Sequence, residues 1–243
     1  MSISRRAFVF GVPAAATVGT AIPAAAQAGS APQPPFQSPI AIRSRDAVPA
    51  PGLPALRIGY PHSADLTLRY VSRDGVCTER GEEEVVQADV PAGVAHVRLG
   101  TTRYELLQYH FHTPSEHTLD GRHYSVEQHF VHRGPAGETL VLGLFLVPGG
   151  HREQVPRHLP EECGEVRPVT VDLAASLPRN LSTFRYQGSL TTAPYSEPVS
   201  WLVLQHAQAV AAAGTVAYRR LFPHGNSREV QPLKGRRVSY RRQ

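Results

Sequence analysis

Apolar residues along this chain gather in short segments that are separated by residues favouring turns. From Leu56 onward these segments are rich in Val, Leu and Tyr and are bounded by Gly, Pro, Asp and Asn. Such punctuation is typical of β-strands. The segments that show it best are residues 66–71, 94–99 and 140–147.

Two stretches instead indicate helices. Residues 152–165 form one, and residues 200–213 form the other, with an Ala- and Gln-rich end that stops at Gly214. There is no internal repeat, and 243 residues with 41% hydrophobic composition suffice for one substantial core. We therefore predict a mainly β (α+β) fold, a single domain with short peripheral helices.

The first 28 residues have the organisation of an export signal. A basic start is followed by a short run rich in Ala, Val and Gly and by an Ala-x-Ala end, so cleavage is expected after Ala26 or Ala28. Arg5 and Arg6 lie in a Ser-Arg-Arg-x-Phe context, which indicates the twin-arginine route. We expect residues 1–28 to direct export to the periplasm, the cell surface or the medium.

A membrane anchor is the alternative interpretation of this segment. Gly11, Pro13 and Gly19 interrupt an apolar run that is already short for a bilayer, so no stable membrane span is expected. The domain itself is then residues 29–243, and it begins with a Pro-rich lead, residues 31–39, that lacks donors for regular structure.

Charge and cysteine content limit the kinds of partner. The formal charge is +5, and the signal holds two basic and no acidic residues, which leaves about +3, too mild to imply nucleic acid. Cys77 and Cys163 are the two cysteines of the chain. They could form a disulfide in an oxidising compartment or remain apart, and they lack the spacing of a cysteine metal site.

Six of the twelve histidines are crowded between Gln108 and His132. Side chains alternate between the two faces of a strand, so His110 and His112 share one face while Tyr109 and Phe111 share the other. The segment therefore has a polar face that carries two imidazoles and an apolar face suited to a core.

A third imidazole follows in the next segment. Catalytic zinc commonly takes three protein ligands and keeps a fourth position for water. His129 meets this need if a turn at residues 120–121 sets the two segments antiparallel. Gln108 and Glu127 each lie two residues before a ligand on the same face, where they can accept its second N–H. The alternative is a surface His-x-His without metal.

These residues resemble the signature of α-carbonic anhydrases, particularly bacterial ones. The matching segments are residues 108–112, 115–118, Tyr124 and 127–132, and three further blocks agree in order. Those blocks are residues 37–40, residues 188–194 followed by Val199 and Trp201, and residues 226–228 leading to 231–233. The resemblance spans roughly residues 36 to 240.

The resemblance implies a large twisted, mostly antiparallel sheet and the zinc-dependent, reversible hydration of CO2 to bicarbonate and a proton by a zinc-bound hydroxide. It implies that Zn2+ is bound by His110, His112 and His129. Thr191 would orient the hydroxide and would itself be oriented by Glu116. Four residues would support the ligands: Gln108, Glu127, His117 and the backbone carbonyl of Asn226.

The resemblance also implies the partners of the site. An apolar pocket for CO2 would be formed by Val131, Val141, Leu190, Thr192, Val199 and Trp201. The ligands would be CO2 and bicarbonate, with anions or sulfonamides as inhibitors.

Three departures from the family pattern change these expectations. Val76 occupies the position of the histidine proton shuttle, so proton transfer should depend on buffer, water or another group, with His62 and His96 as candidates if they are not surface residues. The aromatic segment before residue 37 is missing, so the rim should be open or covered by a second copy in a homodimer. Tyr195 stands where secreted relatives carry a cysteine, so that disulfide is absent.

Two other functions remain as alternatives. A catalytically weak or inactive carbonic-anhydrase-like zinc-binding module would explain the missing shuttle, although all three ligands are kept. An unrelated zinc hydrolase would be expected to show a carboxylate ligand or a His-Glu-x-x-His helix, and neither appears.

Overall fold

The alternating segments form one extensive sheet and a separate two-stranded one in the computed structural model, which describes residues 36–73, 75, 77 and 80–243. The predicted export signal, the first part of the Pro-rich lead and Val76 lie outside the described residues. The first strands are β1 (Ala41–Ile42), β2 (Val48–Pro49), β3 (Leu56–Gly59), β4 (Ala64–Ser72), β5 (Glu84–Asp89), β6 (His96–Leu99), β7 (Thr102–His112) and β8 (Thr118–Leu119). The later ones are β9 (Val126–Arg133), β10 (Thr139–Pro148), β11 (Val166–Val171), β12 (Thr183–Gly188), β13 (Val199–Leu204), β14 (Gln208–Val210) and β15 (Ser239–Arg241).

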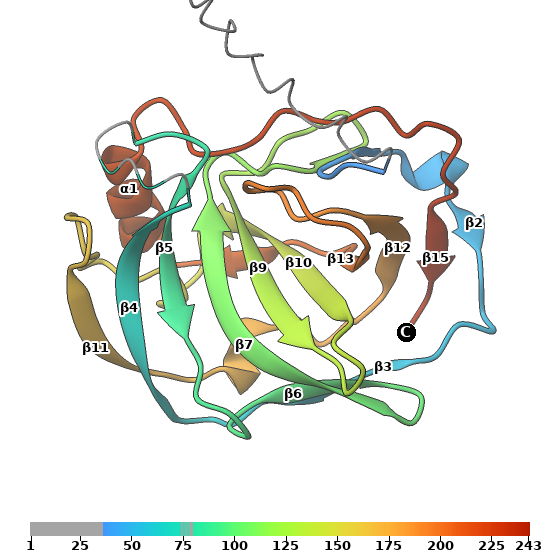
Figure 1. Cartoon of the computed structure of the whole chain (residues 1–243), viewed down its shortest axis with the longest axis horizontal. Helices are drawn as coiled ribbons and strands as arrows, with labels where there is room; N and C mark the ends of the chain where they lie inside the picture. The colour runs from blue at the N-terminus through green and yellow to red at the C-terminus, as the bar shows by residue number, and fades with distance from the viewer. Residues whose placement is uncertain (1–35, 74, 76, 78–79) are drawn as a thin grey trace, which may run out of the picture. The chain divides into compact units, whose positions relative to one another are not determined.

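Thirteen strands join in the main sheet, in the order β11-β4-β5-β7-β9-β10-β13-β12-β15-β2, with β14 beside β10 and with β3 and β6 reaching β7. Most pairs are antiparallel, and the parallel ones are β10 with β13, β10 with β14, and β15 with β2. Figure 1 shows β7, β9 and β10 side by side at the centre of the sheet. The predicted mainly β fold with a mostly antiparallel sheet is confirmed.

Helices are few in the part of the chain that the structure describes. They are the 3-10 turns Ser44–Asp46 and Ala174–Ser176 and the α-helix α1 (Ala212–Leu221). No described helix is both long and apolar enough to cross a membrane.

Both predicted helices are wrong. Residues 152–165 are irregular, because Pro156 and Pro160 lack the N–H that a helix interior requires and restrict the residues before them. Residues 200–213 form most of β13, all of β14 and the start of α1, because the apolar run of β13 is buried by pairing with both β10 and β12. Gly214 lies inside α1 rather than at the end of a helix.

The two faces of β7 lie in different surroundings. Tyr109 and Phe111 are at most 2% exposed and pack with Phe130 of β9 in the main hydrophobic core. The intervening residues, His110 and His112, therefore project from the opposite face of the sheet. The apolar face anchors β7 in the core, and the polar face is available to form a site.

Candidate functional site

Antiparallel pairing of β7 with β9 brings the three predicted ligands together. His110 lies directly opposite His129, and His112 lies opposite Glu127. The ring centroids of the three histidines are 4.8 to 5.2 Å apart. The predicted turn at residues 120–121 exists, with positive φ at Asp120 and Gly121. It closes β8 onto Arg122 within the longer connection 113–125, so it does not join β7 and β9 directly.

One nitrogen of each ring is already engaged by an acceptor. His110 Nδ1 lies 2.9 Å from Gln108 Oε1, and His112 Nδ1 lies 2.8 Å from the backbone oxygen of Asn226. His129 Nε2 lies 3.0 Å from Glu127 Oε1. Carbonyl and carboxylate oxygens only accept, so each of these ring nitrogens carries the proton and donates. The other nitrogen of each ring keeps its lone pair free.

The remaining nitrogens fit a metal ion. One nitrogen from each ring lies within 4.8 Å of the other two, and His112 Nε2 is buried without a hydrogen-bond partner among the described residues. Burial lowers the pKa of all three imidazoles, that of His112 to about 3, so the rings are neutral at physiological pH. Three converging neutral imidazoles form the donor set of a catalytic zinc site.

A second group of potential ligands, His117 with Glu127 and His129, is already paired internally. Glu127 accepts hydrogen bonds from His117 Nδ1 at 2.8 Å, from the His117 backbone N–H at 2.9 Å and from His129. Burial raises the pKa of the Glu127 carboxyl, but His117 and His129 outweigh it and hold that pKa well below its usual range. Glu127 is therefore an ionised orienting group for His129.

This network continues through a residue that the sequence did not identify. His117 Nε2 and the Tyr186 hydroxyl lie 2.6 Å apart in a hydrogen bond, and that hydroxyl also bonds the Ser38 hydroxyl at 2.9 Å. Tyr186 sits on β12 and is buried. Its alternation with Phe184 marks a buried strand face, but nothing in the local sequence indicates its partner.

Thr191 and Glu116 are buried and face one another from distant parts of the chain. Burial holds the pKa of the Glu116 carboxyl well above its usual value, although hydrogen bonds from the Arg228 backbone N–H, 3.0 Å from Oε1, and from the Thr191 hydroxyl act in the opposite direction. Glu116 Oε2 has no partner at normal hydrogen-bond distance among the described residues. The Thr191 hydroxyl is the side-chain group that acts on this carboxyl as a hydrogen-bond donor and lowers its pKa.

The predicted apolar pocket is partly assembled. Val141, Val199 and Trp201 are buried in one cluster, and Val131 and Leu190 pack against it. Trp201 lies 4.9 Å from His129 between ring centroids, so this cluster borders the three histidines. Thr192 lies on the loop between β12 and β13, half-buried and outside the cluster.

The remaining predicted residues have other contacts. His62 pairs with Asp172 at the surface, and His96 lies beside Arg103. Cys77 and Cys163 form a disulfide with their Cα atoms 5.6 Å apart. The Arg228 guanidinium lies over the ring of Tyr195, 3.7 Å from its centroid.

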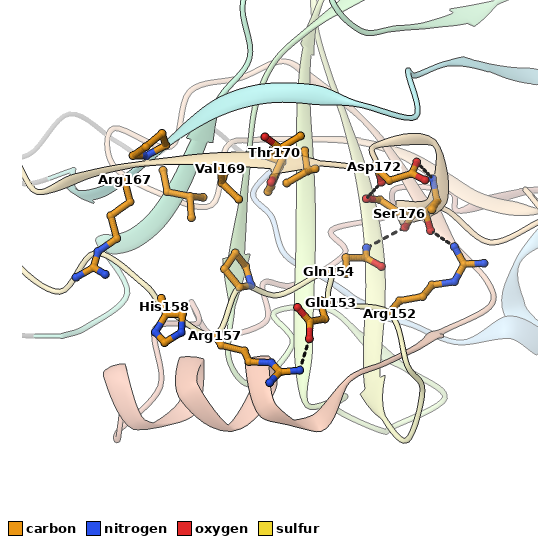
Figure 2. Close-up of a pocket in the computed structure, with 16 residues that line it drawn as sticks. Arg152, Glu153, Gln154, Arg157, His158, Arg167, Val169, Thr170, Asp172 and Ser176 are labelled. Atoms are coloured by element: carbon orange, nitrogen blue, oxygen red, sulfur yellow. Dashed lines mark hydrogen bonds and ion pairs between the residues drawn. The ribbon is translucent and has the colours of Figure 1, made fainter.

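A separate cavity of about 960 Å3 opens between β11 and the segment 152–158. Figure 2 shows that its polar side chains bond one another: Arg157 pairs with Glu153, and Gln154 donates to the Ser176 backbone oxygen. None of the predicted site residues lines this cavity. The histidine cluster remains the candidate site.

Comparisons with known proteins agree with this geometry. The model of a family described as eukaryotic-type carbonic anhydrase matches residues 26–242. A carbonic anhydrase of Klebsiella pneumoniae is 33% identical over 183 residues, 73% of this chain and 74% of that protein. One of Pectobacterium atrosepticum is 35% identical over 158 residues, 62% of this chain and 64% of that protein. The structure of α-carbonic anhydrase from Thermovibrio ammonificans with the inhibitor sulfanilamide superposes with a TM-score of 0.72 and 35% identity, over 84% of this chain and 86% of that chain.

Proposed function

Because the chain belongs to the α-class carbonic anhydrases, a family of lyases, we propose that it catalyses the reversible hydration of CO2 to bicarbonate and a proton at His110, His112 and His129. The observation that carries this proposal is the convergence of three neutral ring nitrogens whose partner nitrogens are each hydrogen-bonded to an acceptor. The resemblance seen in the sequence motifs is confirmed by these comparisons.

We propose that the three histidines hold a zinc ion. When bound, zinc acts as a Lewis acid and lowers the pKa of a coordinated water to about 7. Gln108, Asn226 and Glu127 fix the tautomer and direction of the rings, which keeps the free nitrogens aimed at one point.

Thr191 and Glu116 orient the nucleophile in this proposal. Burial raises the pKa of Glu116, so this step uses the ionised form of the carboxyl. In that form Glu116 accepts the hydroxyl hydrogen of Thr191, and the Thr191 oxygen can then only accept from the water-derived group that attacks CO2. This acceptance directs the lone pair of the attacking oxygen toward the apolar cluster. That cluster of Val131, Val141, Leu190, Val199 and Trp201 suits CO2, which is itself apolar, and excludes water from it.

The proton leaves by a route other than a histidine shuttle at position 76. Valine carries no titratable group, and the described contacts of His62 and His96 are with Asp172 and Arg103. We therefore propose that solvent and buffer accept the proton. We also propose that residues 1–28 are an export signal, and that sulfonamides inhibit the enzyme as sulfanilamide inhibits the Thermovibrio protein.

The test is stopped-flow CO2 hydration by the zinc-loaded chain without residues 1–28, across a series of buffer concentrations. We expect activity that rises with buffer concentration, is blocked by sulfanilamide and is lost in His112→Ala. Stoichiometric zinc without hydration at any buffer concentration would instead favour a zinc-binding module. Activity independent of buffer would show that an internal shuttle exists.

A further inference from the structure

Thr191 sits on a loop that is anchored at its inner end. The loop runs from Gly188 of β12 to Val199 of β13. At its base, Ser189 Oγ accepts the Ser38 N–H at 2.9 Å, and the Trp201 indole donates to the Ser189 carbonyl at 2.9 Å. These contacts hold residue 189, and the Leu190 N–H donates to the Ser196 carbonyl at 2.9 Å, which closes the base of the loop.

The outer part of the loop is held by a carboxylate from another element. Glu83, immediately before β5, accepts the Ala193 backbone N–H at 2.8 Å and the Tyr195 hydroxyl at 2.5 Å. Its own backbone oxygen accepts the Arg73 N–H at 2.7 Å, which ties residue 83 to the end of β4. Burial, and then the hydrogen bond to Glu83, raise the pKa of Tyr195, which stays protonated and donates.

Tyr195 needs such support because its backbone lies in the left-handed region, with φ of 57°. For a residue other than glycine this conformation is unfavourable, so neighbouring contacts must stabilise it. The Arg228 guanidinium lies 3.7 Å from the centroid of the Tyr195 ring. Tyr195 is thus held between Glu83 and Arg228.

Arg228 links this arrangement to the partner of Thr191. Its backbone N–H donates to Glu116 Oε1 at 3.0 Å, and its guanidinium donates to the Ser38 carbonyl at 2.8 Å. The same residue therefore contacts the loop through its side chain and the Glu116 carboxylate through its backbone.

We propose that Glu83, Tyr195 and Arg228, here termed the clasp, are positioning residues that set the distance and direction of the Thr191 hydroxyl relative to Glu116. The inference rests on the proposed function. The clasp acts on the loop two residues beyond Thr191, so its loss lets the hydroxyl turn away from the carboxylate and lose its fixed role as acceptor. A displacement of about 1 Å at a catalytic group can reduce a rate by up to about 100-fold.

The decisive variants are Glu83→Ala and Glu83→Gln, with Glu82→Ala as the matched control. Glu82 is the adjacent, exposed carboxylate and accepts from the Tyr195 hydroxyl at the longer distance of 3.3 Å. All are compared as zinc-loaded proteins by CO2 hydration kinetics, by thermal unfolding and by hydrogen exchange of the Ala193 and Tyr195 amides. Tyr195→Phe, which keeps the ring and its stacking, serves if Glu83→Ala does not fold.

We expect Glu83→Ala to lower kcat for CO2 hydration about 10-fold and to speed exchange at Ala193 at least about 10-fold, with zinc still bound. Glu83→Gln should restore kcat to within about threefold, because the amide oxygen still accepts the Ala193 N–H. Glu82→Ala should match the wild type, and Tyr195→Phe should lie between the wild type and Glu83→Ala.

Three results would overturn the clasp. They are unchanged exchange and kcat in Glu83→Ala, equal losses in Glu83→Ala and Glu83→Gln, which would indicate a charge effect, or an equal loss in Glu82→Ala. Absence of hydration by the wild-type protein would instead refute the proposed function. In that case the exchange measurement still tests whether Glu83 holds the loop.

Discussion

Two buried histidines on β9 show how contacts separate a ligand from a structural residue. His129 uses one ring nitrogen to donate to Glu127 and turns the other toward His110 and His112. His132 uses both nitrogens, bonding the Tyr60 hydroxyl at 2.7 Å and the Leu140 carbonyl at 3.3 Å. The spacing along the strand agrees with these roles, because residues three apart project from opposite faces and only His129 shares the face of His110 and His112.

His132 should make stability fall in mild acid. Burial lowers its pKa to about 4, against about 6.5 in the unfolded chain, and hydrogen bonds to the Leu140 and Phe130 backbone, with a smaller effect of Glu105, only partly oppose this shift. The unfolded state therefore binds a proton first as pH falls, and the folded state loses about 2 kcal/mol between pH 7.5 and 5 through this residue. Urea unfolding at both pH values should show this loss in the wild type and a correspondingly smaller one in His132→Gln. Equal losses in the two proteins would contradict it.

At the scale of elements, the position of α1 is determined by its packing against the segment 152–158 and differs from the helix predicted from composition at residues 200–213. The helix begins at Ala212, and the preceding Ala211 N–H donates to the Arg152 carbonyl at 2.7 Å. A Cβ added at Gly214 would lie 1.9 Å from the Val155 carbonyl oxygen. Gly214 is therefore a point of close backbone approach between α1 and the segment 152–158.

The substitution Gly214→Ala tests this close approach, because two effects predict opposite changes in the free energy of unfolding. Helix propensity alone predicts a gain of about 1 kcal/mol from Gly to Ala. The contact with Val155 predicts instead a loss of about 1 to 3 kcal/mol, because the backbone must move apart. Denaturant unfolding decides between them, with Ala213→Gly at the adjacent exposed position as the control, expected to lose about 1 kcal/mol. A stabilised Gly214→Ala protein would show that the helix is not packed so closely.

At the scale of the whole molecule, one covalent bond closes a long loop across the sheet. Cys77 lies in the connection between β4 and β5, and Cys163 precedes β11, 86 residues later. The closed loop includes the strands β5 to β10, and with them all three histidines of the site. The disulfide therefore restricts the unfolded chain over the region that forms the centre of the sheet.

Removing this disulfide should cost up to about 4 to 5 kcal/mol of unfolding free energy, the value expected for a loop of this length in the chain-entropy description. Urea unfolding of a Cys77→Ser, Cys163→Ser double variant measures the loss. Adding a reductant should weaken the wild type to the same extent and leave the double variant unchanged. Identical midpoints for the oxidised wild type and the double variant would refute this role.

Local patterning determined the parts of the site that lie within a few residues of one another. Alternation along a strand places residues i and i+2 on one face, so the sequence alone puts His110 beside His112 and pairs Gln108 with His110 and Glu127 with His129. The strand character of 66–71, 94–99 and 140–147 followed from the same short-range pattern, and these segments lie within or largely within β4, β6 and β10.

Tertiary structure alone decided the contacts between distant segments. The acceptor for His112 is 114 residues away, Arg228 reaches Glu116 across 112 residues, and Glu83 reaches Ala193 across 110. The first of these was expected only through family resemblance, and the clasp was not expected at all. A short window of sequence shows the periodicity of a single helix or strand. Which elements lie together depends on strand order and on parallel pairing such as that of β10 with β13, and a short window does not show these. The same dependence explains the misplaced helix, since the burial of β13 between two strands overrode a helix-like composition.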